Sequence, residues 1–195
     1  ENKIDYKKQI NLINDFEHNS IILINGVLNS SNFQFEDKTK VIISPFKDTL
    51  IKSIKSQNPL INLNNALFEG GYSLEVLRDY KFIKPLIVYN YSTENLKNKI
   101  FNNKNLIVMN DNSELNLVEL NSDSSKGNFI LNNYTKIAVG AGASLKNFTV
   151  QACVSNGFNY KFLKVLLDKK SNYEDYIFSS GLKFNKTEED IEING

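Results

Sequence analysis

Residues 107–120 read IVMNDNSELNLVEL, and residues 137–150 read IAVGAGASLKNFTV. When these two segments are aligned, five apolar positions coincide, and residues 165–178 supply the same positions a third time. The aligned sets are Ile107, Met109, Leu115, Val118 and Leu120; Ile137, Val139, Leu145, Phe148 and Val150; and Val165, Leu167, Tyr173, Tyr176 and Phe178. A repeat of about thirty residues is typical of solenoids, in which each coil buries an apolar face against the next coil.

Turn-forming residues separate the two parts of each repeat. They are NDNS at 110–113, GAGA at 140–143 and DKKS at 168–171. Small and polar residues let the chain reverse tightly, so the equivalent apolar positions are expected to stack into one continuous core. We therefore predict a mainly β fold, a right-handed parallel β-helix. An up-and-down antiparallel sheet would explain the strands but has no need for the repeat.

The rest of the sequence divides the chain into an N-terminal α/β region, residues 1–71, and the β-helix, residues 72–195. The predicted elements of the first region are a helical stripe over 1–17, a hairpin over Ile21–Leu28 that turns at Asn25-Gly26, a helix capped by Ser44 and begun by Pro45, and a short helix over Leu60–Phe68 that ends at Gly70-Gly71. The predicted strands of the second region are Tyr72–Leu77, Pro85–Tyr91, Leu106–Met109, Glu114–Leu120, Phe129–Leu131, Lys136–Val139, Ser144–Gln151, Phe162–Leu167, Tyr173–Phe178 and Leu182–Phe184, with further alternation over Ile191–Ile193.

Composition narrows the classes of function. The 195 residues hold 23 Lys and Arg against 22 Asp and Glu, a balance that argues against a protein whose main role is to bind nucleic acid. One Cys and one His exclude a disulfide framework and a Cys/His zinc site.

No apolar run is long enough to cross a bilayer and no signal-peptide pattern opens the chain, so we expect a cytoplasmic protein without a membrane partner. Because the chain begins at Glu1 and stops within an alternating pattern, we also expect a fragment of a longer protein.

Four features of the sequence were candidates for chemistry, and we expect none of them to be catalytic, cofactor-binding or metal-binding. A lone Cys153 is more often a small, inert, partly buried residue than a nucleophile, and His18 fits a surface or capping role. Gly140–Ala143 is followed by a predicted strand, whereas a phosphate loop needs a following helix. We expect Glu188–Asp190 to be a solvated turn. Sequence spacing shows no ladder of carboxylates of the kind that carbohydrate-cleaving β-helices carry.

Five segments, in chain order, resemble motifs of the SufB/SufD family, which takes part in SUF iron–sulfur cluster assembly. They are ILINGVL at 22–28, similar to the LVFVDGRF strand typical of SufD; NLNNALFEGG at 62–71, similar to LNTALFxDG; Lys84-Pro85-Leu86, similar to KPIxL; NLIV at 105–108, similar to RNLIVxExGS; and KIAVGAGA at 136–143, similar to xIxLGENA, with Val150-Gln151 closing the rung where the family often reads LQ.

The resemblance implies a β-helix preceded by a helical region, and a non-catalytic scaffold subunit most like SufD. Such a subunit pairs with SufB and binds the SufC ATPase through a C-terminal helical domain, and the iron–sulfur cluster belongs to the assembled complex. No cofactor is then expected in this chain itself. A SufB-type subunit, a homodimer and a β-solenoid enzyme acting on carbohydrate stay open as alternatives.

Overall fold

The computed structural model of the protein describes residues 12–47, 56–123, 128–152 and 156–194. Its elements are β1 (Asn19–Ile24), β2 (Val27–Asn32), β3 (Val41–Pro45), α1 (Pro59–Leu67), β4 (Tyr72–Val76), β5 (Leu86–Ser92), a 3-10 helix at Glu94–Leu96, β6 (Ile100–Met109), β7 (Glu114–Asp123), β8 (Ile130–Val139), β9 (Ser144–Ala152), β10 (Phe158–Asp168), β11 (Asn172–Ser180) and β12 (Phe184–Asn194). None of the helices in this described part of the chain has the length and apolar character of a membrane span.

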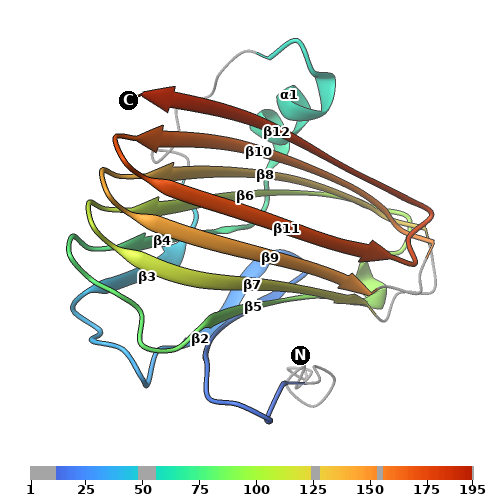
Figure 1. Ribbon diagram of the computed structural model, residues 1–195. Coiled ribbons are helices and arrows are strands. Elements are labelled where there is room, and N and C mark those ends of the chain that lie inside the picture. The colour runs from blue at the N-terminus through green and yellow to red at the C-terminus, as the bar shows by residue number, and fades with distance from the viewer. Residues whose placement is uncertain (1–11, 48–55, 124–127, 153–155, 195) are drawn as a thin grey trace.

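Two six-stranded sheets face each other (Figure 1). Sheet A has the order β11-β9-β7-β5-β1-β2, and sheet B has the order β12-β10-β8-β6-β4-β3. From β4 onward the chain alternates between the sheets, and each strand pairs in parallel with the strand two places later. The chain advances through about four right-handed turns, so the predicted parallel β-helix is confirmed.

The register of the strands reproduces the alignment of the three repeats. Ile107 pairs with Ile137, which pairs in turn with Val165 in sheet B. Leu115 lies beside Leu145 and Leu145 beside Tyr173 in sheet A. The other three aligned positions are also direct neighbours in the ladders. The repeat seen in the sequence is therefore the coil of the solenoid.

The turn between the two sheets is built in the same way in each repeat. The third turn residue has a positive φ in all three coils: 57° at Asn112, 67° at Gly142 and 58° at Lys170. Neighbouring turns also bond to each other, because the Asn112 amide donates to the Ala141 carbonyl and the Gly142 amide to the Lys169 carbonyl, both at 2.9 Å. The predicted tight turns are confirmed, and their backbones stack as the strands do.

Only part of the predicted apolar stack lies inside the solenoid. Leu115, Leu145 and the equivalent sheet B positions are buried in the main core. Val118 and Leu120 instead pack in a second cluster, with Ile87 and other residues of β1 and β5, on the outer face of sheet A. The prediction of one continuous core was wrong here because Val118 follows Leu115 by an odd number of residues, and side chains of a strand alternate between its two faces.

The first strands close one end of the stack. β1 and β2 form the predicted hairpin, with Ile24 opposite Val27 and positive φ values of 50° at Asn25 and 77° at Gly26. The predicted start of a helix at Ser44-Pro45 was wrong, because both residues end β3, an antiparallel edge strand that pairs with β4. A proline is tolerated at the end of an edge strand, and residues 48–55 lie outside the described residues.

Helix α1 covers part of the outer face of sheet B. The Asn58 side chain caps it by accepting from the Leu60 amide at 2.9 Å. Ile61 packs on Leu106 and Tyr134, and the buried Asn64 side chain donates to two strand carbonyls, at 2.9 Å and 2.7 Å. The predicted helix is confirmed, but it ends at Leu67, ahead of the predicted end at Gly70-Gly71.

The limits of other predicted strands and helices differ from those in the structure. The two predicted strands over 129–131 and 136–139 are the single strand β8, and the strand expected at 182–184 is the start of the long β12, which also contains Ile191–Ile193. Of the helical stripe predicted over 1–17, the described residues 12–17 are not helical, and residues 1–11 lie outside the described part. The division after residue 71 stays a prediction.

Candidate functional site

The interior of the solenoid has two halves with different chemistry. The half beside the tight turns is apolar and holds Ile107, Leu115, Ile137, Leu145 and Val165, all at most 3% exposed. The same strands, followed away from those turns, line a cavity of about 50 Å³ with amide, hydroxyl and charged side chains. We call this second part the polar half and treat it as the candidate site.

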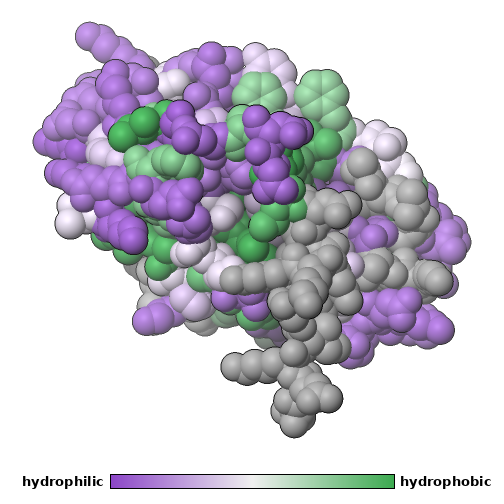
Figure 2. Space-filling view, turned by 90° about the horizontal axis from the view of Figure 1, so that it is seen from below, coloured by the Kyte–Doolittle hydropathy of each residue, from purple (hydrophilic) through white to green (hydrophobic). Residues whose placement is uncertain are grey.

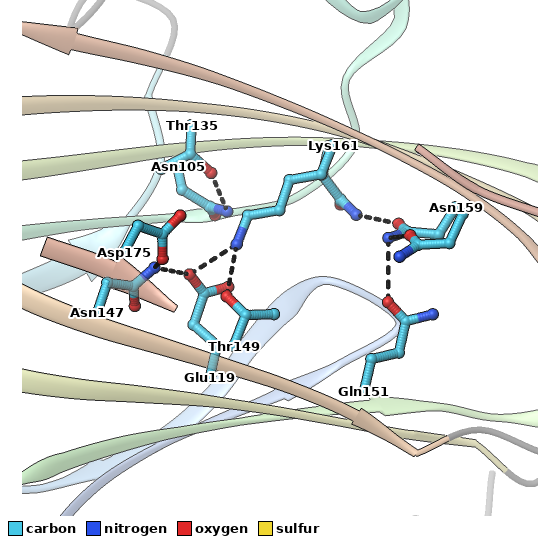
Figure 3. A network of polar contacts seen from close by, with 11 residues as sticks. Asn105, Glu119, Thr135, Asn147, Thr149, Gln151, Asn159, Lys161 and Asp175 are labelled. Carbon is cyan, nitrogen blue, oxygen red and sulfur yellow. Dashed lines mark hydrogen bonds and ion pairs between the residues drawn. The ribbon is translucent and has the colours of Figure 1, made fainter. Parts of the chain in front are cut away.

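A lysine and a glutamate join the two sheets across the polar half (Figure 3). Lys161 projects from β10 and Glu119 from β7, and the Lys161 Nζ to Glu119 Oε1 distance is 2.9 Å. Their side chains are only 8% and 13% exposed. Lys161 also donates to the Thr149 hydroxyl at 3.2 Å. Removing either partner would leave the other charge buried without compensation.

A second carboxylate is tied to this pair by an amide. The Asn147 Nδ2 donates to Asp175 Oδ1 at 2.9 Å and to Glu119 Oε1 at 3.3 Å. Burial is the main cause that raises the pKa of Asp175 to about 6; the Lys161 charge opposes the rise, and the carboxyl groups of Glu189 and Glu119 add to it. Asp175 therefore holds its proton to a higher pH than an ordinary aspartate.

A tyrosine completes the cluster. Burial, with the nearby Asp175 carboxylate as the second cause, raises the pKa of Tyr173 well above its ordinary value, so its hydroxyl stays neutral at physiological pH. Among the described residues, no three His, Cys, Asp or Glu side chains are placed to hold a metal ion.

Asparagine side chains form a ladder along the polar half. Asn103 donates to Asn133 at 3.0 Å, Asn133 to Asn159 at 3.1 Å, and Asn159 to Asn185 at 2.8 Å. The ladder thus crosses four strands of sheet B, and Asn159 also donates to Gln151 of sheet A at 3.4 Å. Repeated amide bonds of this kind satisfy buried polar groups and fix the register of the coils.

The residues singled out in the sequence are not brought together. Cys153 lies outside the described residues. His18 precedes β1 and bonds to the Phe16 carbonyl through Nδ1, at 3.0 Å, and to the Tyr89 hydroxyl through Nε2, at 2.9 Å. Gly140–Ala143 forms the turn between β8 and β9, so a strand follows it as predicted.

The turn predicted at Glu188–Asp190 was wrong. All three residues lie in β12, which pairs with β10 residue by residue from one end to the other. Glu188 accepts from the Tyr160 hydroxyl and Asp190 from Lys164 at 2.8 Å on the outer face, whereas Glu189 is exposed and lies on the inner face of β12, near Asp175. A run of acidic residues in a strand is divided between its two faces.

Sequence reasoning missed the interior cluster, although one signal could have found it. Glu119 follows the buried Leu117 by two residues, and Lys161 precedes the buried Leu163 by two. A period of two therefore places both charged side chains on the inner faces of their strands. The period does not predict that Glu119 and Lys161 form an ion pair with each other.

Residues 91–195 match the family described as "SUF system FeS cluster assembly, SufBD core domain". This match covers more than half of the chain. The chain belongs to the SufBD core domain family. No curated protein matches it. The matched part of this SufBD core contains all strands from β6 to β12, and with them the asparagine ladder and the Lys161–Glu119 pair. The chain is thus a component of the SUF system, and the match is common to SufB and SufD.

Proposed function

We propose that this SufBD core domain is the scaffold part of a SufD-type subunit, which assembles with SufB and SufC in the cytoplasm. The observation that carries the proposal is the match of residues 91–195 to the SufBD core. The choice of SufD over SufB rests on the hairpin strand at residues 22–28, whose sequence resembles the SufD motif and which the structure forms as β1 and β2.

We further propose that the subunit is not an enzyme. The charged side chains of the polar half are bonded to one another: Lys161 to Glu119, and Asn147 to both Glu119 and Asp175. These bonds across the interior support a role in holding the two sheets together. In this proposal the iron–sulfur cluster is the cargo of the assembled complex, and its ligands come from outside the described residues.

A SufB-type subunit is the second candidate, because the matched family includes both subunits. A carbohydrate-active solenoid is less well supported. Glu119 and Asp175 are joined through Asn147 inside the solenoid, whereas a polysaccharide would need carboxylates along an open groove.

Co-expression tests the proposal. The protein, carrying an affinity tag, would be expressed with untagged SufB and SufC. We expect the three proteins to elute together from affinity and size-exclusion columns. Elution of the tagged protein alone, while SufB and SufC stay associated, would overturn the scaffold proposal. In a second co-expression, SufD replaces SufB. If the tagged protein forms a complex with SufC in the presence of SufD but not of SufB, it is a SufB-type subunit instead.

A further inference from the structure

Apolar side chains follow one another along the outer face of sheet A from β1 to β11, and among the described residues they are buried at one end and exposed at the other. Two rows of apolar side chains cross it: Ile87, Val118, Phe148 and Tyr176; and Ile22, Tyr89, Leu120, Val150 and Phe178. Exposure increases along the rows, from 0% at Ile87 and 3% at Tyr89 to 43% at Tyr176 and 62% at Phe178. Figure 2 views the molecule from below, at the end of the stack where β2 lies, and hydrophobic side chains interrupt the hydrophilic surface there.

The covered end lies under the segment Leu12–His18, which we call the strap. Ile13 of the strap packs against the cluster that contains Ile22, Ile87 and Tyr89. The strap has no regular secondary structure, and hydrogen bonds to the sheet add to the packing of Ile13 and to an ion pair of Glu17 in holding it. One polar group of the covered face, the Tyr89 hydroxyl, takes part in two of them.

The Tyr89 hydroxyl lies between two groups of the strap. It accepts from the Ile13 amide at 3.1 Å and lies 2.9 Å from His18 Nε2. The other ring nitrogen of His18, Nδ1, is 3.0 Å from the Phe16 carbonyl. A carbonyl oxygen only accepts, so Nδ1 carries the hydrogen, and Nε2 of a neutral ring then accepts from the Tyr89 hydroxyl. Each donor is matched with an acceptor.

Protonation of His18 breaks this match. Nε2 becomes a donor, so the Tyr89 oxygen faces two donors, and the hydrogen of this buried tyrosine loses its acceptor. Tyr89 cannot adapt by ionising, because burial raises its pKa. Imidazole is the side chain whose charge ordinarily changes between pH 5 and 8.

The charged groups around the strap are engaged elsewhere. Glu17 of the strap pairs with Lys84, which precedes β5, at 2.8 Å. Glu36, from the loop after β2, accepts from the Asn19 side chain and the Tyr80 hydroxyl, each at 2.7 Å. Asp15 is exposed on the strap itself. No carboxylate is thus bonded to His18 among the described residues to favour its protonated form in place.

We propose that the strap is a pH-dependent cover of sheet A, held by neutral His18 and released when His18 is protonated. Release uncovers Ile22, Ile87 and Tyr89, which then join the exposed rows in one apolar surface. The inference rests on the strap contacts alone and does not depend on the proposed function.

Hydrogen exchange followed by mass spectrometry tests the cover, using the whole chain at pH 7.5 and pH 5.5 with labelling times scaled to the intrinsic exchange rate. We expect amides of residues 12–18 to exchange roughly fivefold faster at the lower pH, as for the loss of about one hydrogen bond. His18→Gln should exchange equally at both values, since Gln cannot be protonated. Asp175→Asn is the control, because Asp175 titrates near pH 6 in the interior and its loss should leave the strap response intact.

Two further variants keep the test decisive. Tyr89→Phe preserves the apolar ring and should expose the strap at both pH values. Phe16→Trp places the only tryptophan of the chain next to His18; its emission should shift to longer wavelength at pH 5.5 and should not shift when His18→Gln is added. Equal protection of residues 12–18 at both pH values in the wild type, or a response that survives His18→Gln, would overturn the proposal.

Discussion

The two halves of the solenoid interior use the same strands for opposite purposes. In the apolar half, Leu115, Leu145 and their neighbours contact one another without any directional bond. In the polar half, Lys161, Glu119 and the asparagine ladder are held by specific donors and acceptors. Burial of apolar surface can stabilise several alternative strand registers, because it has no preferred direction. A buried ion pair or amide ladder has its hydrogen bonds satisfied in a single register. The comparison indicates that the apolar half supplies most of the stability and the polar half selects the alignment of the coils.

The strongest test of the polar half is Lys161→Met. The substitution keeps the length of the side chain but leaves the Glu119 carboxylate buried without a cation. We expect the free energy of unfolding to fall by about 3–5 kcal/mol, measured by urea denaturation followed by far-UV circular dichroism. The double variant Lys161→Met with Glu119→Leu should recover most of this loss, because no charge is then buried. A double variant as unstable as the single one would contradict the pairing.

In the apolar half, Leu145→Ala should cost about 3 kcal/mol in the same measurement, because it leaves a cavity in a site that is 0% exposed. Val150→Ala is the matched control on the same strand. It faces outward and is half-buried, so its cost should be about 1 kcal/mol. Equal losses for the two variants would argue that Val150 faces the core, as the sequence repeat had predicted.

The asparagine ladder should give a smaller effect. Asn133→Ala removes one acceptor and one donor from the middle of the ladder, and we expect a loss of about 1–2 kcal/mol. Asn116→Ala, at an exposed position of β7, should change stability by less than about 0.5 kcal/mol. If the two variants were equally stable, the ladder would contribute nothing beyond a surface amide.

The smallest effect is expected from Asp175→Asn, because Asp175 is only partly buried. The pKa of Asp175 is raised from 3.8 to about 6, so the folded state binds this proton more tightly than the unfolded chain does. The stability it contributes is fully present below pH 3.8 and is lost as the pH rises through 6. The variant should therefore unfold at higher urea than the wild type at pH 7.5, with the difference vanishing toward pH 4. A difference that grows toward acid pH would contradict the raised pKa.

The sequence predicted what depends on local pattern. Alternation and turn residues predicted how the three repeats align, and Asn25-Gly26 predicted the hairpin, since both signals act within a few residues. Ser44-Pro45 shows the limit of such signals. The pair suits the start of a helix, but β3 is held by β4, about thirty residues later, and this pairing overrides the local preference.

The polar half could not be predicted because its contacts are distant. Glu119 and Lys161 lie 42 positions apart and on different sheets. Alternation places each side chain inward, but the contact exists only because β7 and β10 face each other across the interior. His18 and Tyr89 are a similar case, 71 positions apart, and neither has a local pattern that indicates the other.

Because the turns of successive coils stack in the same way, a whole coil can be inserted or removed as one unit. Asn112, Gly142 and Lys170 occupy one place in successive coils, and all have a positive φ. Any coil that keeps this turn and the alternation around it presents the same surface above and below. Removal of residues 110–139 would join β6 directly to the turn that precedes β9, with every inward side chain still inward. The length of such a solenoid can therefore change by whole coils, through duplication or loss of about thirty codons, while the fold stays the same.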